Sequence, residues 1–277
     1  MKIWSNLDRN IKDLVQRLKN KSFKPLPSLR VYIPKANGKK RPLGIASYED
    51  KIVQMAVKKI LGAIYEPRFL NCMYGFRPNR SCHEAIKEVY QRISYGKISY
   101  IVDADIKGFF DHIDHEWMMK FLEWNLQDKN LLWLIRKYLK AGIMEQGKYE
   151  ATEEGSAQGS VMSPMLANIY MHHVLTLWFK FVVQKEMQGD CFLVNFADDF
   201  VVGFQYKSEA ERYYKQLKER MEKFGLKLES SKSRLIEFGR FAEQNRRARG
   251  ERKPETFDFL GFTFYCSKNR KGGFALK

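Results

Sequence analysis

Two adjacent carboxylates, Asp198 and Asp199, stand between two apolar runs that favour β-structure, residues 191–197 and 200–204. This pattern predicts a tight hairpin whose turn carries both acids. An Asp-Asp turn can serve simply to face water, because turns favour Asp. Both runs, however, have the composition of strands buried on two faces, so we expect the two acids to lie at the edge of a core.

A third carboxylate follows another predicted strand. Residues 99–102 should form a central strand ending at Asp105, and by strand alternation Asp103 shares its face, so periodicity does not choose between them. Gathering Asp105, Asp198 and Asp199 would cost free energy, because like charges about 4 Å apart repel by about 4 kcal/mol at an effective dielectric of about 20. Proteins accept this cost mainly where divalent metal binds. Two Mg²⁺ ions with oxygen ligands form the clamp used in phosphoryl and nucleotidyl transfer.

The three carboxylates stand in sequence blocks that resemble those of reverse transcriptases. Residues 196–199, Phe-Ala-Asp-Asp, look like the signature hairpin of that family. Residues 105–111, Asp-Ile-Lys-Gly-Phe-Phe-Asp, look like its first catalytic block. The resemblance selects Asp105 rather than Asp103. It implies that the catalytic residues are Asp105, Asp198 and Asp199. These three carboxylates would hold two Mg²⁺ ions, with Mn²⁺ as the alternative metal.

The resemblance also implies a set of nucleotide-binding residues: Arg41, Lys51, Phe110, Gln158 and Lys232. Phe110 takes the position of the ribose gate, where an aromatic ring clashes with a 2′-hydroxyl and so favours deoxynucleotides. On spacing alone it is equally a core phenylalanine. Lys51 stands where the family has a basic residue near the phosphates. Lys232, within residues 226–234, corresponds to a lysine that approaches the triphosphate, although a surface lysine fits the pattern as well.

Residues 31–45 look like the fingers hairpin of the family. Their Asn37-Gly38 pair is a strong hairpin-turn signal. The turn would display four basic residues, Lys35, Lys39, Lys40 and Arg41. The resemblance implies that these reach the incoming triphosphate and the template, whereas the alternative is a solvated basic tip.

Template and primer contacts are implied for four residues: Arg77, Gly159, Pro164 and Gly261. Arg77 lies in a block, residues 74–85, that matches the template-contacting block. Residues 155–170 contain Gln-Gly-x-x-x-Ser-Pro, similar to the block that lies against template and nucleotide, with Pro164 in the first turn of a helix. They continue as Leu-Ala-Asn-Ile-Tyr, the form carried by group II intron reverse transcriptases, the intron-encoded maturases. Residues 257–264 look like the primer grip, where Gly261 would let the primer backbone approach closely.

The composition favours a polyanionic partner. Lys and Arg total 49 against 32 Asp and Glu, which gives a net charge of +17. No apolar run reaches the ~18 residues that a membrane span needs. The four cysteines form no close pair and indicate reduced thiols. We therefore expect a bacterial-type cytoplasmic protein associated with nucleic acid and not with a membrane, and homodimer formation stays open. Residues 240–253 are highly basic without helical period, which predicts a mobile loop that either contacts RNA or is merely solvated.

The predicted fold class is α+β: the fingers and palm of a right-hand polymerase. The resemblance places the fingers at residues 1–95 and the palm at 96–277, with residues around 130–165 returning towards the fingers. It implies that the palm is a split βαβ antiparallel sheet with packed helices, and we expect the thumb or maturase domain and the endonuclease to be absent.

The implied function is an RNA-directed DNA polymerase of a group II intron-type retroelement. It would use dNTPs, an RNA template with a DNA primer, and intron RNA whose binding supports splicing and mobility. Two alternatives stay open: an RNA-binding splicing cofactor (maturase) with little polymerase activity, and a CRISPR-associated or defence reverse transcriptase.

Overall fold

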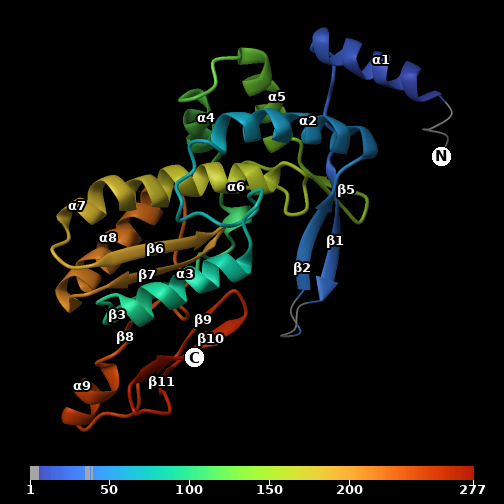
Figure 1. The fold of residues 1–277 in the computed structure, drawn as a ribbon. Coiled ribbons are helices and arrows are strands. Elements are labelled where there is room, and N and C mark those ends of the chain that lie inside the picture. Colours follow the sequence, from blue (N-terminus) through green and yellow to red (C-terminus); the bar gives the residue numbers. More distant parts are fainter. Residues whose placement is uncertain (1–5, 35–37, 39) are drawn as a thin grey trace.

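A computed structural model of the chain describes residues 6–34, 38 and 40–277. Its strands form two four-stranded sheets, ordered β6-β7-β3-β8 and β2-β1-β4-β5, and two hairpins, β9–β10 and β11–β12. Figure 1 shows the first sheet on one side, with long helices above it, and the β1–β2 ribbon projecting on the other. The mixed helix-and-sheet arrangement confirms the predicted α+β class.

The sheet that carries the predicted acids is antiparallel throughout. Its strands are β6 (Cys191–Phe196), β7 (Asp199–Phe204), β3 (Tyr100–Ala104) and β8 (Arg234–Glu237). Phe196 pairs with Asp199, so only two residues make the turn, and the predicted hairpin is confirmed. Ala104 pairs with Phe200. Asp105, one residue beyond β3, therefore lies at the same edge of the sheet as Asp198 and Asp199.

This sheet is buried on both faces, because apolar side chains alternate to either side of each strand. Val102, Phe200 and Val202 belong to one apolar cluster, and Ile101, Val194 and Val201 to the other. The first cluster includes side chains of three helices, α4 (His115–Glu123), α6 (Ser163–Met171) and α8 (Lys207–Lys223). The second includes α3 (Cys82–Tyr95), β9 (Phe257–Phe259), β10 (Phe262–Phe264), β11 (Cys266–Lys268) and β12 (Phe274–Leu276).

One long helical run crosses the first face of the sheet (Figure 1). It consists of α6, two π-helical segments, His172–Thr176 and Phe179–Val183, and α7 (Gln184–Glu186). Pro164 is at the first turn of α6, as predicted. The π segments widen the helix, a feature found frequently near functional sites.

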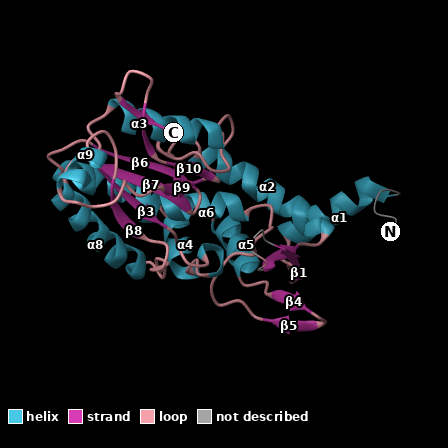
Figure 2. Cartoon of the chain, turned by 90° about the horizontal axis from the view of Figure 1, so that it is seen from below, coloured by secondary structure: helices cyan, strands magenta, loops and turns pink. Residues whose placement is uncertain are grey.

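The N-terminal sheet is assembled from two distant parts of the chain. β1 (Ser28–Pro34) pairs antiparallel with β2 (Lys40–Ile45) and parallel with β4 (Ile143–Glu145), which pairs with β5 (Lys148–Glu150). Figure 2 shows β4 and β5 beside β1, below α5 (Lys129–Leu139). Three residues expected in the β1–β2 turn, Lys35, Asn37 and Lys39, lie outside the described residues. The division into fingers and palm at residue 95 stays a prediction, and α3, on its fingers side, packs against the palm-side sheet.

Helix starts follow local side-chain chemistry. α2 (Tyr48–Tyr65) begins after Ser47, whose hydroxyl accepts a hydrogen bond from the Asp50 amide, and Asp114 caps α4 in the same way. α1 (Leu7–Lys19) lies at the periphery (Figure 1), where its Leu14 joins the first apolar cluster and its Arg17 pairs with Glu49 of α2. No helix of the described residues is long and apolar enough to cross a membrane.

The predicted mobile loop at residues 240–253 is wrong in part, because the structure forms a helix there, α9 (Ala242–Ala248). Ion pairs hold this segment in place. Arg249 pairs with Glu237 and Glu251, and Arg246 lies 3.6 Å from Glu251. Acidic partners within and just before the segment therefore neutralise charges that, taken alone, suggested an unstructured run.

Candidate active site at the edge of the sheet

The turn that carries Asp198 is held by a buried network. Ala197 has φ of 58°, and its carbonyl accepts a hydrogen bond of 2.7 Å from the amide of Asn195, a fully buried side chain. The backbone of Asn195 bonds in turn to Cys72 and Tyr74. A Cβ on Gly75 would lie 2.5 Å from the Ala197 nitrogen, so only glycine lets that loop pack against the turn.

A further contact ties this network to α6, where the Asn168 amide donates a hydrogen bond of 2.7 Å to the Gly75 carbonyl. Sequence reasoning missed Asn195, Asn168 and Gly75 as supporting residues. Their one available signal was the presence of polar or glycine positions inside apolar surroundings.

Asp199 is oriented from the opposite side by the β9–β10 turn. The Leu260 amide donates to Asp199 Oδ2 at 3.3 Å, and Leu260 and Gly261 both have positive φ. Nothing lies within 4 Å of a Cβ built on Gly261. Glycine is therefore favoured there by backbone conformation, and its outer side is open. The predicted primer-grip hairpin is thus in direct contact with a predicted catalytic carboxylate.

The electrostatics of the site are those of carboxylates held together away from water. Burial raises the pKa of Asp199 to about 6, and the neighbouring charges of Asp198, Asp105 and Asp103 add to the effect. Burial also raises the pKa of Asp198, where Asp105 contributes and Arg41 acts in the opposite direction. Arg41, on β2, therefore lies close enough for its positive charge to lower the pKa of Asp198.

Lys232 supplies the positive charge next to Asp105. Its Nζ lies 2.7 Å from Asp105 Oδ2, and this hydrogen bond raises the pKa of the lysine. Asp103 instead lies 3.5 Å from Arg234. The two acids that strand alternation could not separate thus have different partners, and Asp105 is the one beside the hairpin acids.

Among the residues that the structure describes, no three His, Cys, Asp or Glu side chains are already gathered around a single cation position. The donor chemistry nevertheless suits a hard divalent ion, since three carboxylates converge on one edge. The raised pKa values of Asp198 and Asp199 reflect the burial of these two carboxyls and the repulsion between neighbouring charges. In this arrangement the Lys232 ammonium provides the cation at Asp105, and it would have to move for a metal to bind there.

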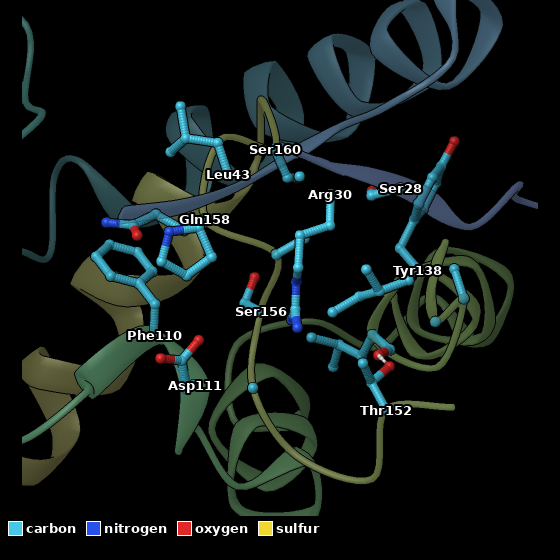
Figure 3. Close-up of a pocket in the computed structure, with 18 of the residues that line it drawn as sticks. Ser28, Arg30, Leu43, Phe110, Asp111, Tyr138, Thr152, Ser156, Gln158 and Ser160 are labelled. Atoms are coloured by element: carbon cyan, nitrogen blue, oxygen red, sulfur yellow. Dashed lines mark hydrogen bonds between the residues drawn. The ribbon is translucent and has the colours of Figure 1, made fainter. Parts of the chain in front are cut away.

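A cavity of about 270 Å³ lies between the N-terminal sheet, Phe110 and Asp111, and the loop that contains residues 154–162. Figure 3 shows Phe110 and Gln158 side by side at one end of it, with Arg30 and Tyr138 further in. Two backbone hydrogen bonds fix this arrangement: the Ser156 amide to the Phe110 carbonyl, 2.7 Å, and the Gly44 amide to the Gln158 carbonyl, 2.6 Å.

The loop that carries Gln158 is also held from α2. Oε1 of the buried Gln54 accepts hydrogen bonds from the Ser160 hydroxyl at 3.0 Å and the Val161 amide at 2.9 Å. Gly159 has φ of 102°, and a Cβ there would lie 3.0 Å from the Gly44 carbonyl oxygen. The structure therefore brings three of the predicted residues, Phe110, Gln158 and Gly159, to the region around one cavity.

Two predicted residues are placed differently. Arg77, expected to contact the template, has a side chain only 9% exposed, and its guanidinium donates to Glu66 and to the carbonyls of Leu70 and Met73. The protein itself occupies these donors in this structure, and the template contact of Arg77 stays a prediction. Lys51 lies on the exposed face of α2 in a separate shallow hollow with Tyr48 and Met55.

An antiparallel sheet with carboxylates at one edge of adjacent strands, near a glycine-containing loop and the Phe110 ring, is the arrangement of a template-directed nucleic-acid polymerase fold. Residues 33–264 match the family model described as reverse transcriptase (RNA-dependent DNA polymerase). The chain belongs to this family, whose members generally use divalent metal ions.

Several similar proteins are named as products of introns. The chain is 44% identical over 184 residues to the group II intron-encoded protein LtrA of Lactococcus lactis, covering 66% of this chain and 30% of LtrA. It is 40% identical over 164 residues to a 91 kDa protein in the cob intron of Schizosaccharomyces pombe, covering 59% of this chain and 20% of that protein. The chain thus spans less than a third of either relative.

Solved structures support the fold. Telomerase from Candida albicans superimposes with a TM-score of 0.65 at 15% identity, over 87% of this chain and 44% of that one. Telomerase from Candida tropicalis gives a TM-score of 0.64 at 13% identity, over 95% of this chain and 58% of that one. At such low identity the likeness shows the polymerase fold and nothing finer.

Proposed function

We propose that this chain is the catalytic part of a group II intron-type reverse transcriptase, which extends a DNA primer on an RNA template. One observation carries the proposal: the strand register brings Asp105, Asp198 and Asp199 to the same sheet edge, where the β9–β10 turn orients Asp199. The primer 3′-oxygen would attack the α-phosphorus of a dNTP, the bond to the β-phosphate oxygen would break, and pyrophosphate would leave.

Asp105, Asp198 and Asp199 would hold Mg²⁺. When bound, the metal supplies charge neutralisation at the phosphates and lowers the pKa of the attacking hydroxyl. The protein's own groups do the rest. Arg41 and Lys232 bring positive charge to the triphosphate, the Phe110 ring closes the space beside C2′ of the sugar, and the Gln158-Gly159 loop lies against the nucleotide. Gly261 leaves room for the primer backbone.

Primer extension on an RNA template tests the proposal. Asp198→Asn or Asp199→Asn should abolish Mg²⁺-dependent extension while folding and RNA binding stay nearly intact. Asp190→Asn is the matched control, because this exposed aspartate stands just before β6, at the other end of the same hairpin. Extension by either hairpin variant at close to the parent rate would show that these carboxylates do not carry the reaction.

A second function, RNA binding that supports splicing, is favoured by the intron-encoded relatives and by the net charge of +17. It requires no carboxylate chemistry. In a splicing assay with the chain's cognate intron, Asp198→Asn should therefore keep splicing activity that the polymerase assay has lost. Loss of both activities together would argue against a separate splicing role. The CRISPR-associated alternative gains no support from the relatives described above, and the predicted homodimer and cytoplasmic location stay predictions.

A further inference from the structure

The basic segment at residues 240–253 takes no part in the site above, and the structure divides its charges into two groups. Arg246 and Arg249 are ion-paired with Glu237, Glu251 or Glu255 and hold the segment together. Arg247 lies in the same helix and forms no ion pair with any residue of the described part of the chain. It is exposed, so its charge is available to a ligand.

Arg247 lines a hollow of about 550 Å³ between α9 and the β11–β12 hairpin. We call this the α9 hollow, and its side chains include Arg240, Phe241, Glu243, Arg247, Lys268 and Phe274. Its size is within the range of sites that hold small organic ligands. Glu243 is its one acidic lining residue and is already paired with Lys268 at 3.2 Å. The Arg240 guanidinium donates to the Ser94 carbonyl and, within the described residues, has no carboxylate partner. Two arginines thus leave the hollow positively charged.

The same hollow exposes an aromatic ring. Phe241 is 53% exposed, although its neighbour Ala242 is buried. Proteins bind single-stranded RNA through guanidinium groups that contact phosphates bidentately and through aromatic rings on which bases stack. The α9 hollow offers both kinds of group. A surface that bound a polyanion through charge alone would not need an exposed aromatic ring.

The α9 hollow lies at the end of the sheet opposite the carboxylates. Glu237, two residues before Gly239 of the hollow, pairs with Tyr100 at the start of β3, whereas Asp105 follows its end. Five residues at about 3.3 Å each separate these positions by about 17 Å. Figure 1 accordingly shows α9 at the far side of the sheet from the β6–β7 turn. A ligand in the hollow cannot touch the reacting nucleotide.

We propose that the α9 hollow is a second RNA-binding site, which holds one or two unpaired nucleotides through phosphate contacts to Arg240 and Arg247 and stacking on Phe241. RNA anchored there is held independently of the primer terminus. This inference rests on the proposed function only for the choice of RNA as the polyanion. Arg270 and Lys271 lie in the β11–β12 turn beside the hollow and add positive charge at its border.

The test uses the 277-residue chain and a fluorescent oligouridine of about 12 nucleotides, a length suited to single-strand sites. The double variant Arg240→Gln/Arg247→Gln should lower affinity at least tenfold and reduce the slope of log affinity against log salt by about 1.4, the value for two single-strand phosphate contacts. Phe241→Ala should lower affinity about tenfold and leave the slope unchanged.

The matched control is Lys185→Gln/Lys215→Gln, which removes the same charge from exposed positions on α7 and α8. It should change affinity less than twofold. Equal losses in the control and in the double variant, or an unchanged salt slope in the double variant, would overturn the proposal. Thermal melting of every variant checks that the fold is kept.

Location is measured separately, by crosslinking a 4-thiouridine form of the probe and mapping the modified peptides. A crosslink within residues 240–248 that Phe241→Ala removes supports the proposal, and crosslinks confined to other segments overturn it. A parallel assay replaces RNA with phosphatidylserine vesicles. If the double variant weakened vesicle binding but left RNA binding unchanged, the proposal would also be overturned. The rate at which a single nucleotide is added to a saturating primer–template should be unchanged in these variants. The RNA-binding proposal for the α9 hollow and the polymerase proposal can therefore fail separately.

Discussion

Phe110 combines two properties that usually exclude one another, core contact and access to a cavity. Its ring packs edge-on against Phe109, at 5.4 Å between centroids, while its side chain lines the 270 Å³ cavity beside Gln158. Core packing alone would explain a phenylalanine at this position. Its place at the cavity is the reason to predict that its size affects which sugar is accepted.

Replacing Phe110 with Val should therefore relax sugar selection. The smaller side chain leaves room for a 2′-hydroxyl, and differences of this size in a pocket change discrimination by roughly 10- to 200-fold. The ratio of kcat/KM for a deoxynucleotide and its ribonucleotide, measured on one template, should fall by that amount. If the ratio stayed the same while stability fell, Phe110 would be core packing and nothing more.

Asp199 makes stability depend on pH in a direction opposite to that of a salt-bridged acid. Its pKa is raised to about 6, so the folded protein binds a proton at higher pH than the unfolded chain does. The ionised carboxylate therefore destabilises the metal-free fold above pH about 6, and this cost disappears as the pH falls from about 6 to about 4. A difference of about 2 between the folded and unfolded pKa values of this carboxyl corresponds to about 3 kcal/mol.

Asp199→Asn should accordingly raise the free energy of unfolding at neutral pH, by an amount of up to about 3 kcal/mol that vanishes near pH 4. Asparagine keeps an oxygen that can accept from the Leu260 amide. Urea titrations with EDTA across this pH range measure the difference, and Asp190→Asn provides the comparison. An advantage that grew as the pH fell would have the wrong sign and would refute the assignment.

At the scale of elements, the carboxylate turn depends on a loop that carries no chemistry. Gly75→Ala would place a Cβ 2.5 Å from the Ala197 nitrogen and 2.9 Å from the Phe196 carbonyl carbon. Backbone on both sides has little freedom to yield. We expect a loss of about 1–3 kcal/mol in stability and at least a tenfold lower kcat, because the turn must shift.

Gly62→Ala in α2 is the control for this substitution. Its Cβ would meet only Met165 Cε at 3.6 Å, an ordinary contact, and the helix should gain about 0.5–1 kcal/mol. Equal activity in the two alanine variants would mean that the turn tolerates displacement.

Gln54 connects α2 to the loop that carries Gln158. Gln54→Leu would leave the buried Ser160 hydroxyl and Val161 amide without their acceptor, at a cost of about 1–3 kcal/mol. Since the loop lies against the predicted nucleotide position, KM for the nucleotide should rise more than kcat falls. Ser160→Ala removes only the hydroxyl and should have the smaller effect. A stability loss with unchanged KM would restrict Gln54 to a structural role.

The whole molecule is a polycation, and its charge sets how it binds RNA. A net charge of +17 predicts that affinity for a primer–template falls steeply with salt, by about 10³-fold or more between about 50 and 200 mM if six or more phosphates are contacted. Filter binding or anisotropy at several salt concentrations measures this slope. Asp198→Asn should show the same slope, and weak salt dependence would rule out phosphate contacts as the main source of affinity.

The sequence predicted the elements whose signals are local. Alternation and the Asp-Asp pair located the β6–β7 hairpin and the strand before Asp105, and Pro164 placed the start of α6. What the sequence did not show depended on which side chains meet in the fold. Arg77 appeared available until Glu66 and two carbonyls occupied it, and α9 appeared unstructured until glutamates neutralised Arg246 and Arg249. The supports of the turn, Asn195 and Gly75, become visible only when loop and hairpin meet.

The parallel pairing of β1 with β4 also constrains when the protein can fold. β1 ends at Pro34, but its partner ends at Glu145, so the N-terminal sheet cannot be completed until more than a hundred further residues have been synthesised. At typical elongation rates this interval is roughly 5–20 s. During it, the free edge of the β1–β2 ribbon is open to other chains. The nascent protein therefore needs protection at the free edge of the β1–β2 ribbon until β4 has been synthesised.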